Sequence, residues 1–448
     1  MSLSNNKETS FTRFLPSPLT IAILLTFLTF VLTFIFTENK HDNAHILNLL
    51  SYWEKGLWDN NMLVFAFQMM LIMILGHTLA LTFFFRNLIK KITQFCNDTA
   101  TSAAIVTFFT IIVGLINWGL GLIFGAILAR KVAERASLKK IRINYPLIGA
   151  CGYTGMMVWH GGLSGSAPIK AATKNHLLTD LQISSEIVPD IILLSETIFS
   201  PMNIIITISL MLILPLGMYI IGKKYNGDFI SILPTKIENE NLVKVNKIDN
   251  SPFIAYISSF TILFYCIYSV IFNEDIDPIN FINLCLLGFS ILLHKSINQF
   301  GKAVNSAIGG AAGILIQFPL YFGILGIMRD SGFAGMISDV FVSISNENSF
   351  PIFTYISGAI VNIFVPRGGG QWAIQGPIII EAASELGVSY SKSIMALSYG
   401  DQITNMLQPF WALPLLWITG LKAKEILPYS FLMFIIGSGI FILGLLLF

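Results

Sequence analysis

The sequence predicts an all-α polytopic membrane protein with about nine transmembrane helices, two re-entrant hairpins and two interrupted helices, arranged as two inverted repeats. Three observations predict this fold class. Of the 448 residues, 54% are hydrophobic and only 12% are charged, whereas soluble domains carry about 25% charged residues. Apolar runs long enough to cross a bilayer recur along the chain. Glycine-rich turns and polar positions also repeat between its two halves.

The apolar runs predict most of the spanning helices. A transmembrane helix needs about 20 mostly apolar residues, and the runs at 18–36, 62–85, 200–221, 253–271 and 426–448 are of about that length. No polar stretch between them is long enough for a soluble domain. Because no small-residue cleavage site follows the first run, we expect it to remain as the first helix. The absence of an arginine-rich leader favours a bacterial cytoplasmic (inner) membrane.

The charged residues predict the orientation, because cytoplasmic loops carry an excess of Lys and Arg. This rule places the N-terminus in the cytoplasm and the C-terminus outside. The four basic clusters are Arg86, Lys90 and Lys91; Arg130, Lys131, Arg135, Lys139, Lys140 and Arg142; Lys223 and Lys224; and Lys295 with Lys302. The acidic residues expected on the outer face are Asp42, Glu54, Asp59, Asp180, Glu186, Asp190, Glu274, Asp275 and Asp277. Since the charges are sorted by loop, we expect no nucleic-acid partner.

The apolar stretch at 103–129 has basic residues at both ends, which a simple crossing cannot satisfy. At its centre lies the turn-forming run 117–121, Asn-Trp-Gly-Leu-Gly. These residues predict a re-entrant hairpin that enters and leaves on the cytoplasmic side, its tip buried in protein or lining a cavity. One long helix with glycines for close packing is the alternative, since glycine is common in membrane helices.

An internal repeat is the most specific feature, and inverted repeats with discontinuous helices are typical of secondary transporters. Asn117 aligns with Asn362, Tyr153 with Tyr399, Pro168 with Pro414, Ala150 with Ala396 and Gln68 nearly with Gln317. We therefore predict a first repeat at 1–222, a cytoplasmic linker at 223–250, a connecting transmembrane helix at 251–272 and an inverted second repeat at 273–448. The second hairpin, roughly 350–387, would enter from outside.

Two glycine-rich segments are predicted to interrupt their helices. Each glycine in a regular helix costs about 1 kcal/mol relative to alanine, so a break is the simpler interpretation of 152–169. A helix that restarts after a break presents amides with a partial positive charge, which can hold a carboxylate. The predicted substrate-binding residues are Asn117, Ser164, Gly165, Ser166, Asn362, Arg367, Gly368, Gly369, Gly370, Gln371, Gln375 and Asn405.

Polar groups at membrane depth usually face an interior cavity, and charges there are rare. Asp401 could ligate a sodium ion or take up a coupled proton, or it could pair with Arg367 or lie near the outer surface. His160 could relay a proton or serve as a hydrogen-bonded packing residue. Arg367 could bind the carboxylate or extend to the outer face. The predicted ion-coupling residues are Asp401, Gln402, Tyr153, Tyr399 and His160.

Aromatic residues flank these polar positions: Trp159, Trp372, Phe410 and Trp411. They could form the wall of an apolar acyl pocket, and aromatic packing explains them equally well. Four scattered cysteines form neither a disulfide framework nor a metal-ligand spacing. We therefore expect no cofactor and no resident metal, only a transported H⁺ or Na⁺.

Three runs of the sequence resemble a known family. WHGGLSGSAP (159–168), VPRGGGQWAIQGP (365–377) and YGDQITNMLQPFWALP (399–414) are similar to those of the bacterial short-chain fatty acid transporters, the acetoacetate and butyrate uptake family. The start at 13–16 and the run 117–119 are similar too, so the resemblance covers essentially the whole chain. It implies a cytoplasmic membrane permease for small monocarboxylates, within the wider ion transporter superfamily of hairpin-containing anion carriers. Arg367 replaces the usual small hydroxyl residue and His160 the usual glycine.

The sequence distinguishes three classes of function: an enzyme, a passive channel and a carrier. An enzyme would need a nucleophile with a base or a ligand cluster, and the sequence offers none. A passive channel predicts a continuous polar pore face, whereas the polar residues here gather at two breaks. We therefore expect a carrier that works by alternating access, with both hairpins and both interrupted helices moving as one unit. The alternatives are a carrier for another small carboxylate and a passive anion channel. Its partners would be the carboxylate, the lipid bilayer and, by fold-level analogy, a second copy in a homodimer.

Overall fold

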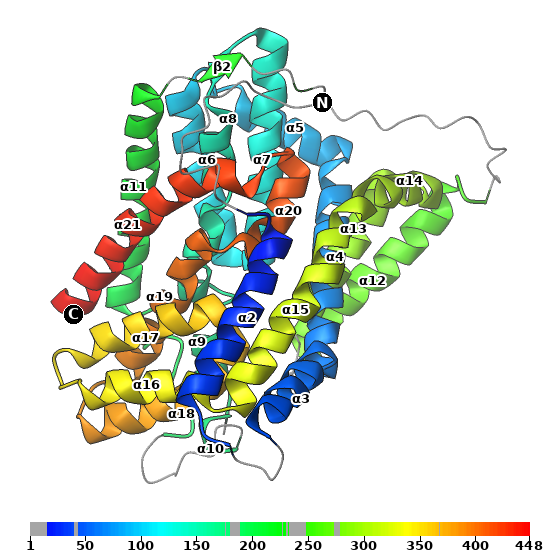
Figure 1. Cartoon of the computed structure of the whole chain (residues 1–448). Coiled ribbons are helices and arrows are strands. Elements are labelled where there is room, and N and C mark those ends of the chain that lie inside the picture. The colour runs from blue at the N-terminus through cyan, green and yellow to red at the C-terminus, as the bar shows by residue number, and fades with distance from the viewer. Residues whose placement is uncertain are drawn as a thin grey trace.

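The computed structural model describes residues 16–39, 44–174, 176–179, 189–225, 227–229, 232, 248–272, 278–366 and 368–448. Within these residues the chain is almost wholly helical (Figure 1). Two short strands, β1 (Arg142–Ile143) and β2 (Asp228–Phe229), pair antiparallel at one end of the bundle. Seven of the described helices are long and apolar enough to cross a membrane. The protein is therefore a multi-pass, all-α membrane protein.

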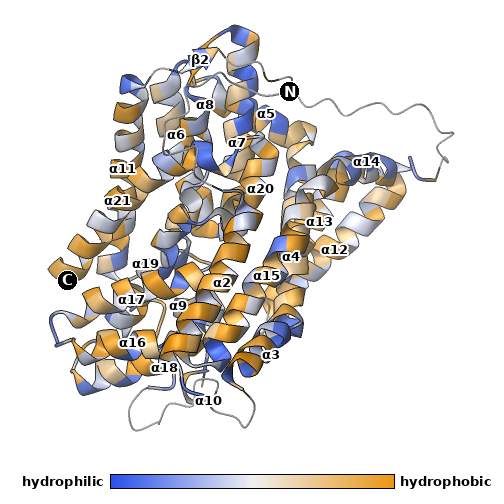
Figure 2. Ribbon diagram, viewed as in Figure 1, coloured by the Kyte–Doolittle hydropathy of each residue, from blue (hydrophilic) through white to orange (hydrophobic). Residues whose placement is uncertain are grey.

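One group of helices packs around α15 and α4, and we call it the scaffold group. Helix α15 contacts α2, α3 and α4, while α13 contacts α4 and α12. Figure 2 shows apolar residues along the flanks of α2 and α12, where they would face lipid. The group comprises α2 (Pro18–Phe36), α3 (His45–Leu57), α4 (Asn60–Ala80), α12 (Pro252–Phe272), α13 (Pro278–His294), α14 (Ile297–Ala307) and α15 (Ala311–Asp330), which the turn η3 (Ile308–Gly310) precedes.

The other helices form the hairpin group. Helices α6 and α7 form one hairpin, and α17 and α18 form another. Two further helices are interrupted: α8 and α9 are the two parts of the first, and α19 and α20 are the two parts of the second. Helices α11 and α21 pack against α6 and α8, so they extend the moving unit expected from the sequence. The bounds are α6 (Thr99–Ile116), α7 (Trp118–Lys139), α8 (Tyr145–Cys151), α9 (Ser166–Ala171), α11 (Pro201–Lys224), α17 (Phe350–Phe364), α18 (Gly368–Glu385), α19 (Tyr390–Thr404), α20 (Pro409–Thr419) and α21 (Ala423–Leu447).

Short helices lie at the two ends of the bundle. Helices α5 (Phe83–Thr93) and α14 lie at the same end as β2 and the start of α2 (Figure 1). Helices α3, α16 (Phe333–Ser343) and α10 (His176–Thr179) lie at the opposite end. The basic residues of α5 thus share an end with the first described residues. That this end faces the cytoplasm stays a prediction.

The apolar runs found in the sequence correspond closely to α2, α4, α11, α12 and α21. In both halves, the order of elements is a long helix, a surface helix, a long helix, a surface helix, a hairpin, an interrupted helix and a closing long helix. The bounds predicted for the two inverted repeats, and the entry side of each hairpin, stay predictions. Most of the predicted linker lies outside the described residues, as do Asp42, Asp180, Glu186, Glu274, Asp275 and Asp277 of the expected outer face.

Candidate functional site

The tip of the first hairpin is formed by a single residue, Asn117. It ends α6, and its Oδ1 accepts a hydrogen bond from Leu120 N at 3.0 Å, capping the start of α7. The next amide, Trp118 N, donates to Ser164 Oγ at 3.1 Å. Leu163 N donates to Leu115 O at 2.7 Å. The predicted turn residue and the predicted serine therefore meet where the hairpin contacts the first interrupted helix.

The first interrupted helix breaks over 152–165. Helix α8 ends at Cys151, two 3₁₀ turns follow, η1 (Thr154–Met157) and η2 (Trp159–Gly161), and α9 begins at Ser166. Backbone packs directly on backbone here: a methyl group on Gly152 would lie 2.5 Å from Gly125 O. The glycines are thus required by the close approach of the hairpin, in addition to weakening the helix.

The second interrupted helix breaks after Thr404, where a 3₁₀ turn (η4, Asn405–Leu407) leads to Gln408 in an extended conformation. Asn362, on the first arm of the second hairpin, donates from Nδ2 to Asp401 O at 2.6 Å and to Asn405 Oδ1 at 3.2 Å. Gln408 Nε2 donates back to Asn362 O at 2.7 Å. An amide side chain at this position ties the hairpin to the freed carbonyls of the break.

The two breaks contact each other at the centre of the hairpin group. His160 N donates to Gln402 Oε1 at 2.9 Å, and Asn405 Nδ2 donates to Met156 O at 3.2 Å. Tyr153 OH lies 3.4 Å from Gln408 O, its hydrogen-bond acceptor. The two breaks of the interrupted helices are therefore adjacent.

His160 and Asp401 face each other in this centre. Their side chains are 1% and 4% exposed, and His160 Nε2 lies 3.5 Å from Asp401 Oδ2. The ring of His160 packs on Trp159, with 3.7 Å between centroids. A methyl group on Gly368, the first residue of α18, would lie 2.3 Å from His160 Nε2. The start of α18 thus contacts the imidazole directly. Because the side chain of Asp401 is only 4% exposed and faces this imidazole, Asp401 lies in the buried site and not at the surface.

Other predicted residues lie apart from this centre. Gln371 Nε2 donates to Gln375 Oε1 at 2.8 Å. Gln375 Nε2 in turn donates to Ser338 Oγ of α16 and to Ser357 Oγ of α17. Both glutamines are therefore bonded within the second hairpin, and Gln375 also to α16. Trp372 Nε1 donates to His176 Nε2 at 3.0 Å. Gly165, Ser166, Gly369 and Gly370 flank the breaks at the starts of α9 and α18. Arg367 lies outside the described residues.

Asn203 is a residue that the sequence reasoning missed. Its Nδ2 donates to Gly161 O at 2.8 Å and to Ile198 O at 2.7 Å, and its Oδ1 accepts from Tyr399 OH at 2.9 Å. It is buried in α11 and joins the first break to α19. Tyr399 therefore acts here as a support for the break. An amide side chain inside an otherwise apolar run was the signal available in the sequence.

An aromatic cluster separates the breaks from the scaffold group. Trp118 lies 6.0 Å from Trp159 and 5.0 Å from Trp411 between ring centroids, and Phe318 of α15 stacks on Phe410 at 4.1 Å. Beside these rings is an apolar cavity of about 20 Å³. This is about the space that one water molecule occupies. Of the predicted aromatic residues, Trp159, Phe410 and Trp411 belong to this cluster.

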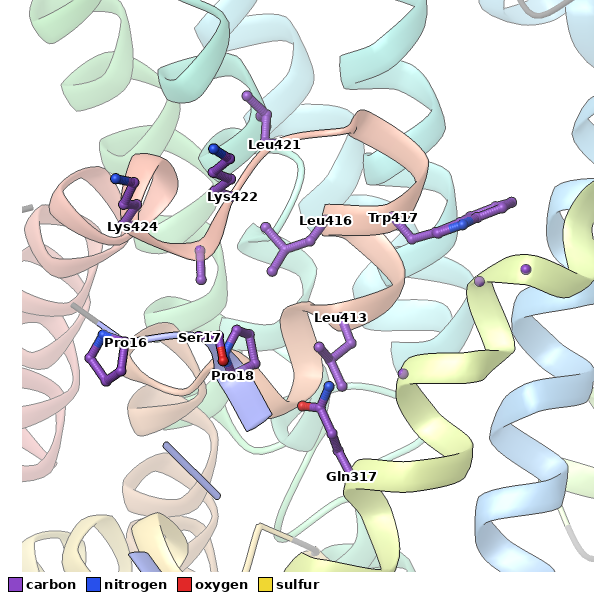
Figure 3. Close-up of a pocket in the computed structure, with 14 residues that line it drawn as sticks. Pro16, Ser17, Pro18, Gln317, Leu413, Leu416, Trp417, Leu421, Lys422 and Lys424 are labelled. Atoms are coloured by element: carbon purple, nitrogen blue, oxygen red, sulfur yellow. The ribbon is translucent and has the colours of Figure 1, made fainter. Parts of the chain in front are cut away.

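A larger cavity, of about 480 Å³, opens between the two groups at the end of the bundle that carries α5 and α14 (Figure 3). Gln317 and Leu413 lie on opposite walls, on α15 and α20, and Lys422 and Lys424 lie near its rim (Figure 3). This cavity does not include the residues of the two breaks. It marks the seam where the hairpin group could move against the scaffold group.

Three comparisons place the chain among known proteins. Residues 2–448 match the family model described as short chain fatty acid transporter. A protein of Haemophilus influenzae, named provisionally a short-chain fatty acid transporter, is 38% identical and covers 99% of this chain and 98% of its own. A protein of Escherichia coli with the same provisional name is 36% identical, with 97% of each chain covered.

Two solved structures are distantly similar. MtrF of Neisseria gonorrhoeae, from a class of antimetabolite efflux pumps, has a TM-score of 0.45 and 14% identity, with 96% of this chain and 97% of that chain covered. The YdaH transporter of Alcanivorax borkumensis has a TM-score of 0.43 and 15% identity, with 96% and 98% covered.

Proposed function

The chain belongs to the short-chain fatty acid transporter family, and from this membership we propose that it carries short-chain acids such as acetoacetate or butyrate across a bacterial cytoplasmic membrane, coupled to a proton or sodium gradient. The family is one of transporters, and the similar proteins are named as transporters, not as enzymes. The substrate, the coupling ion and the cytoplasmic position of the N-terminus are parts of the proposal.

One observation carries the proposal: two broken helices contact each other between two hairpin tips, at the centre of the bundle. Helix α18, the second arm of the second hairpin, begins with three glycines, so its first residues carry no side chains of their own over its first amides. Such amides, with their partial positive charge, can hold a carboxylate without a buried full charge. The hydroxyl groups of Ser164 and Ser166 lie at the other break, beside the start of α9.

The aromatic cluster accounts for a preference for short acids. Trp118, Phe410 and Trp411 fill the space between the breaks and the scaffold group, leaving an apolar cavity of only about 20 Å³. An alkyl tail that extends from the carboxylate would meet these rings. We propose that the rings limit the tail to a few carbons.

Asp401 is the proposed coupling residue, with Gln402, Tyr153, Tyr399 and His160 around it. An unpaired carboxylate at membrane depth costs several kcal/mol, and the carboxylates that are found there commonly mark ion pathways. Asp401 is 3% exposed and faces His160 across 3.5 Å. Its carboxylate can take up a proton or ligate a sodium ion, and the freed carbonyls of the break supply further oxygen ligands for a cation.

Uptake by proteoliposomes tests the function. Labelled butyrate and acetoacetate should accumulate under an imposed proton gradient or sodium gradient, each applied separately. Unlabelled butyrate inside should accelerate entry of labelled butyrate, because a carrier returns faster when loaded. Uptake that never exceeds equilibrium and shows no such counterflow would favour the alternative, a passive anion channel.

A further inference from the structure

We propose that the imidazole of His160 is a direct ligand of the transported carboxylate, acting together with the first backbone amides of α18. The inference rests on the proposed function and deepens it by naming the side chain that meets the anion. It gives His160 a binding role distinct from the relay role expected from the sequence. Three independent observations lead to it.

First, the ring of His160 is buried without a hydrogen-bond partner. The residue is 1% exposed, and among the described residues neither Nδ1 nor Nε2 makes a hydrogen bond. Buried polar atoms are hydrogen-bonded in the great majority of cases. Asp401 Oδ2 lies 3.5 Å from His160 Nε2, within ion-pair distance but outside hydrogen-bond geometry. The ring nitrogens are therefore available to a ligand.

Second, the imidazole is held in position by its neighbours. The backbone amide of His160 donates to Gln402 Oε1 at 2.9 Å, and the carbonyl of the next residue, Gly161, accepts from Asn203 Nδ2 at 2.8 Å. The ring rests on Trp159. These contacts fix the backbone of the 3₁₀ turn on both sides, so the side chain is preorganised for an incoming group.

Third, the ring is directed at the start of α18. Only glycine at 368 permits the contact, since a methyl group there would lie 2.3 Å from Nε2. The first amides of a helix have no partner within their own helix and carry a partial positive charge. Beside Gly369 there is open space: among the described residues, apart from its chain neighbours and the nearby backbone of α18, no atom lies within 4 Å of a methyl group at that position. A carboxylate at this end of α18 would contact both donors.

Charge balance supports the same arrangement. An imidazole N–H, or an imidazolium with Asp401 as its counter-charge, can donate to the anion, and α18 contributes only partial charge. In the present conformation Gly368 packs directly on the ring. The start of α18 at Gly368 must therefore move away from His160 to admit the carboxylate, which links binding to a movement of α18.

The test uses the full chain in proteoliposomes, with His160→Phe and His160→Leu as paired variants, because neither side chain can donate a hydrogen bond to the carboxylate. Loss of one charge-assisted hydrogen bond should raise the half-saturation concentration for butyrate counterflow about tenfold or more. The maximal exchange rate should stay within about threefold, because the variants retain the hydrophobic core. Their folding is checked by size-exclusion chromatography and thermal unfolding.

His77→Leu is the matched control. His77 of α4 is also buried, and its Nδ1 also lacks a hydrogen bond, yet its ring packs on Trp417, away from the breaks. Its half-saturation concentration should match that of the wild-type protein. An unchanged half-saturation concentration in both His160 variants would overturn the proposal. If gradient-driven uptake were then lost, His160 would be a proton relay; if it were retained, His160 would be a packing residue.

A binding measurement separates this inference from the proposed function. Butyrate, acetoacetate and succinate are added to the purified protein, and the shift in its thermal unfolding temperature is recorded. If the wild-type protein transports no monocarboxylate but is stabilised by one of these probes only when His160 is present, the proposed function fails and the inference stands. Stabilisation that persists in both His160 variants, or that no probe produces, would overturn the inference.

Discussion

At position 368, the hydrogen atom that glycine has in place of a side chain lets the ring of His160 pack against the start of α18. The ring occupies the place where any other residue at 368 would put its Cβ, 2.3 Å from Nε2. Added bulk in such a packed position forces shifts that typically cost about 1–3 kcal/mol. The contact therefore constrains position 368 to glycine, independently of the conformational freedom of glycine.

Gly368→Ala should consequently impair transport more than folding. We expect butyrate counterflow to fall about tenfold or more, because the added methyl group would keep the ring of His160 and the first amides of α18 from contacting one carboxylate together. Gly439→Ala in α21 is the control, since among the described residues no atom of another element lies within 4 Å of its added methyl group. Wild-type counterflow by Gly368→Ala, at equal protein in the vesicles, would show that this contact has no role.

Asp401→Asn should separate coupling from exchange. The amide is nearly isosteric with the carboxylate, but it can neither take up a proton nor offer a full negative charge to sodium. Gradient-driven accumulation of labelled butyrate should be abolished, whereas counterflow should persist. Full gradient-driven uptake by this variant would show that the coupling role belongs elsewhere.

At the level of residues, the sequence predicted which side chains lie at the hairpin tips and breaks better than it predicted the partners of the surrounding side chains. Asn117, Ser164, Asn362 and Asn405 lie at the hairpin tips and breaks because turn-forming and polar residues are costly anywhere else in a membrane helix. Gln375 was placed with them because it follows the three glycines that start at Gly368, yet a position along a helix does not reveal which neighbour a long side chain bonds. Tertiary contacts decided that outcome.

At the level of elements, close backbone packing joins each hairpin to its interrupted helix. A methyl group on Gly400 of α19 would lie 2.1 Å from Tyr355 O of α17, and Gly152 meets Gly125 in the same manner. Glycines at helix interfaces let backbones approach closely in membranes. Each hairpin and its broken partner can therefore move as one body.

Gly400→Ala should loosen this contact. We expect a fall of several degrees in the thermal unfolding temperature of the purified protein, since overpacking against a backbone carbonyl has no flexible side chain to absorb it. Gly439→Ala should leave that temperature within about a degree of the wild-type value or raise it slightly, because alanine favours a helix. Equal temperatures for the two variants would mean that α17 and α19 can separate at little cost.

Hydropathy predicted the long helices well and the surface helices poorly. The runs at 18–36 and 253–271 reappear almost unchanged as α2 and α12. Helices α5 and α14 are short and carry polar residues on one face, so a search for apolar length passes over them. Their helical period of polar and apolar residues was present in the sequence, but only the structure shows that they connect spanning helices at the ends of the bundle.

At the level of the whole molecule, the seam between the two groups is where the movement of the proposed alternating-access mechanism would take place. Helix α20 of the hairpin group faces α15 of the scaffold group, and Gly313 and Leu413 lie opposite each other on the wall of the large cavity. A Cβ on Gly313 would lie 3.9 Å from Leu413 Cβ. That separation is suited to a disulfide, which needs about 3.5–4.5 Å between Cβ atoms.

A cysteine pair at 313 and 413 should therefore lock the carrier reversibly. In a chain whose four native cysteines are replaced by alanine, oxidation should join α15 to α20 and stop both driven uptake and counterflow, and a reducing agent should restore them. Each single-cysteine variant controls for the substitutions and should be insensitive to oxidant. If the cross-linked protein still exchanges butyrate as fast as the same protein with its disulfide reduced, α20 does not slide past α15 during transport. The moving parts would then be the hairpin tips alone, because these remain free when the seam is closed.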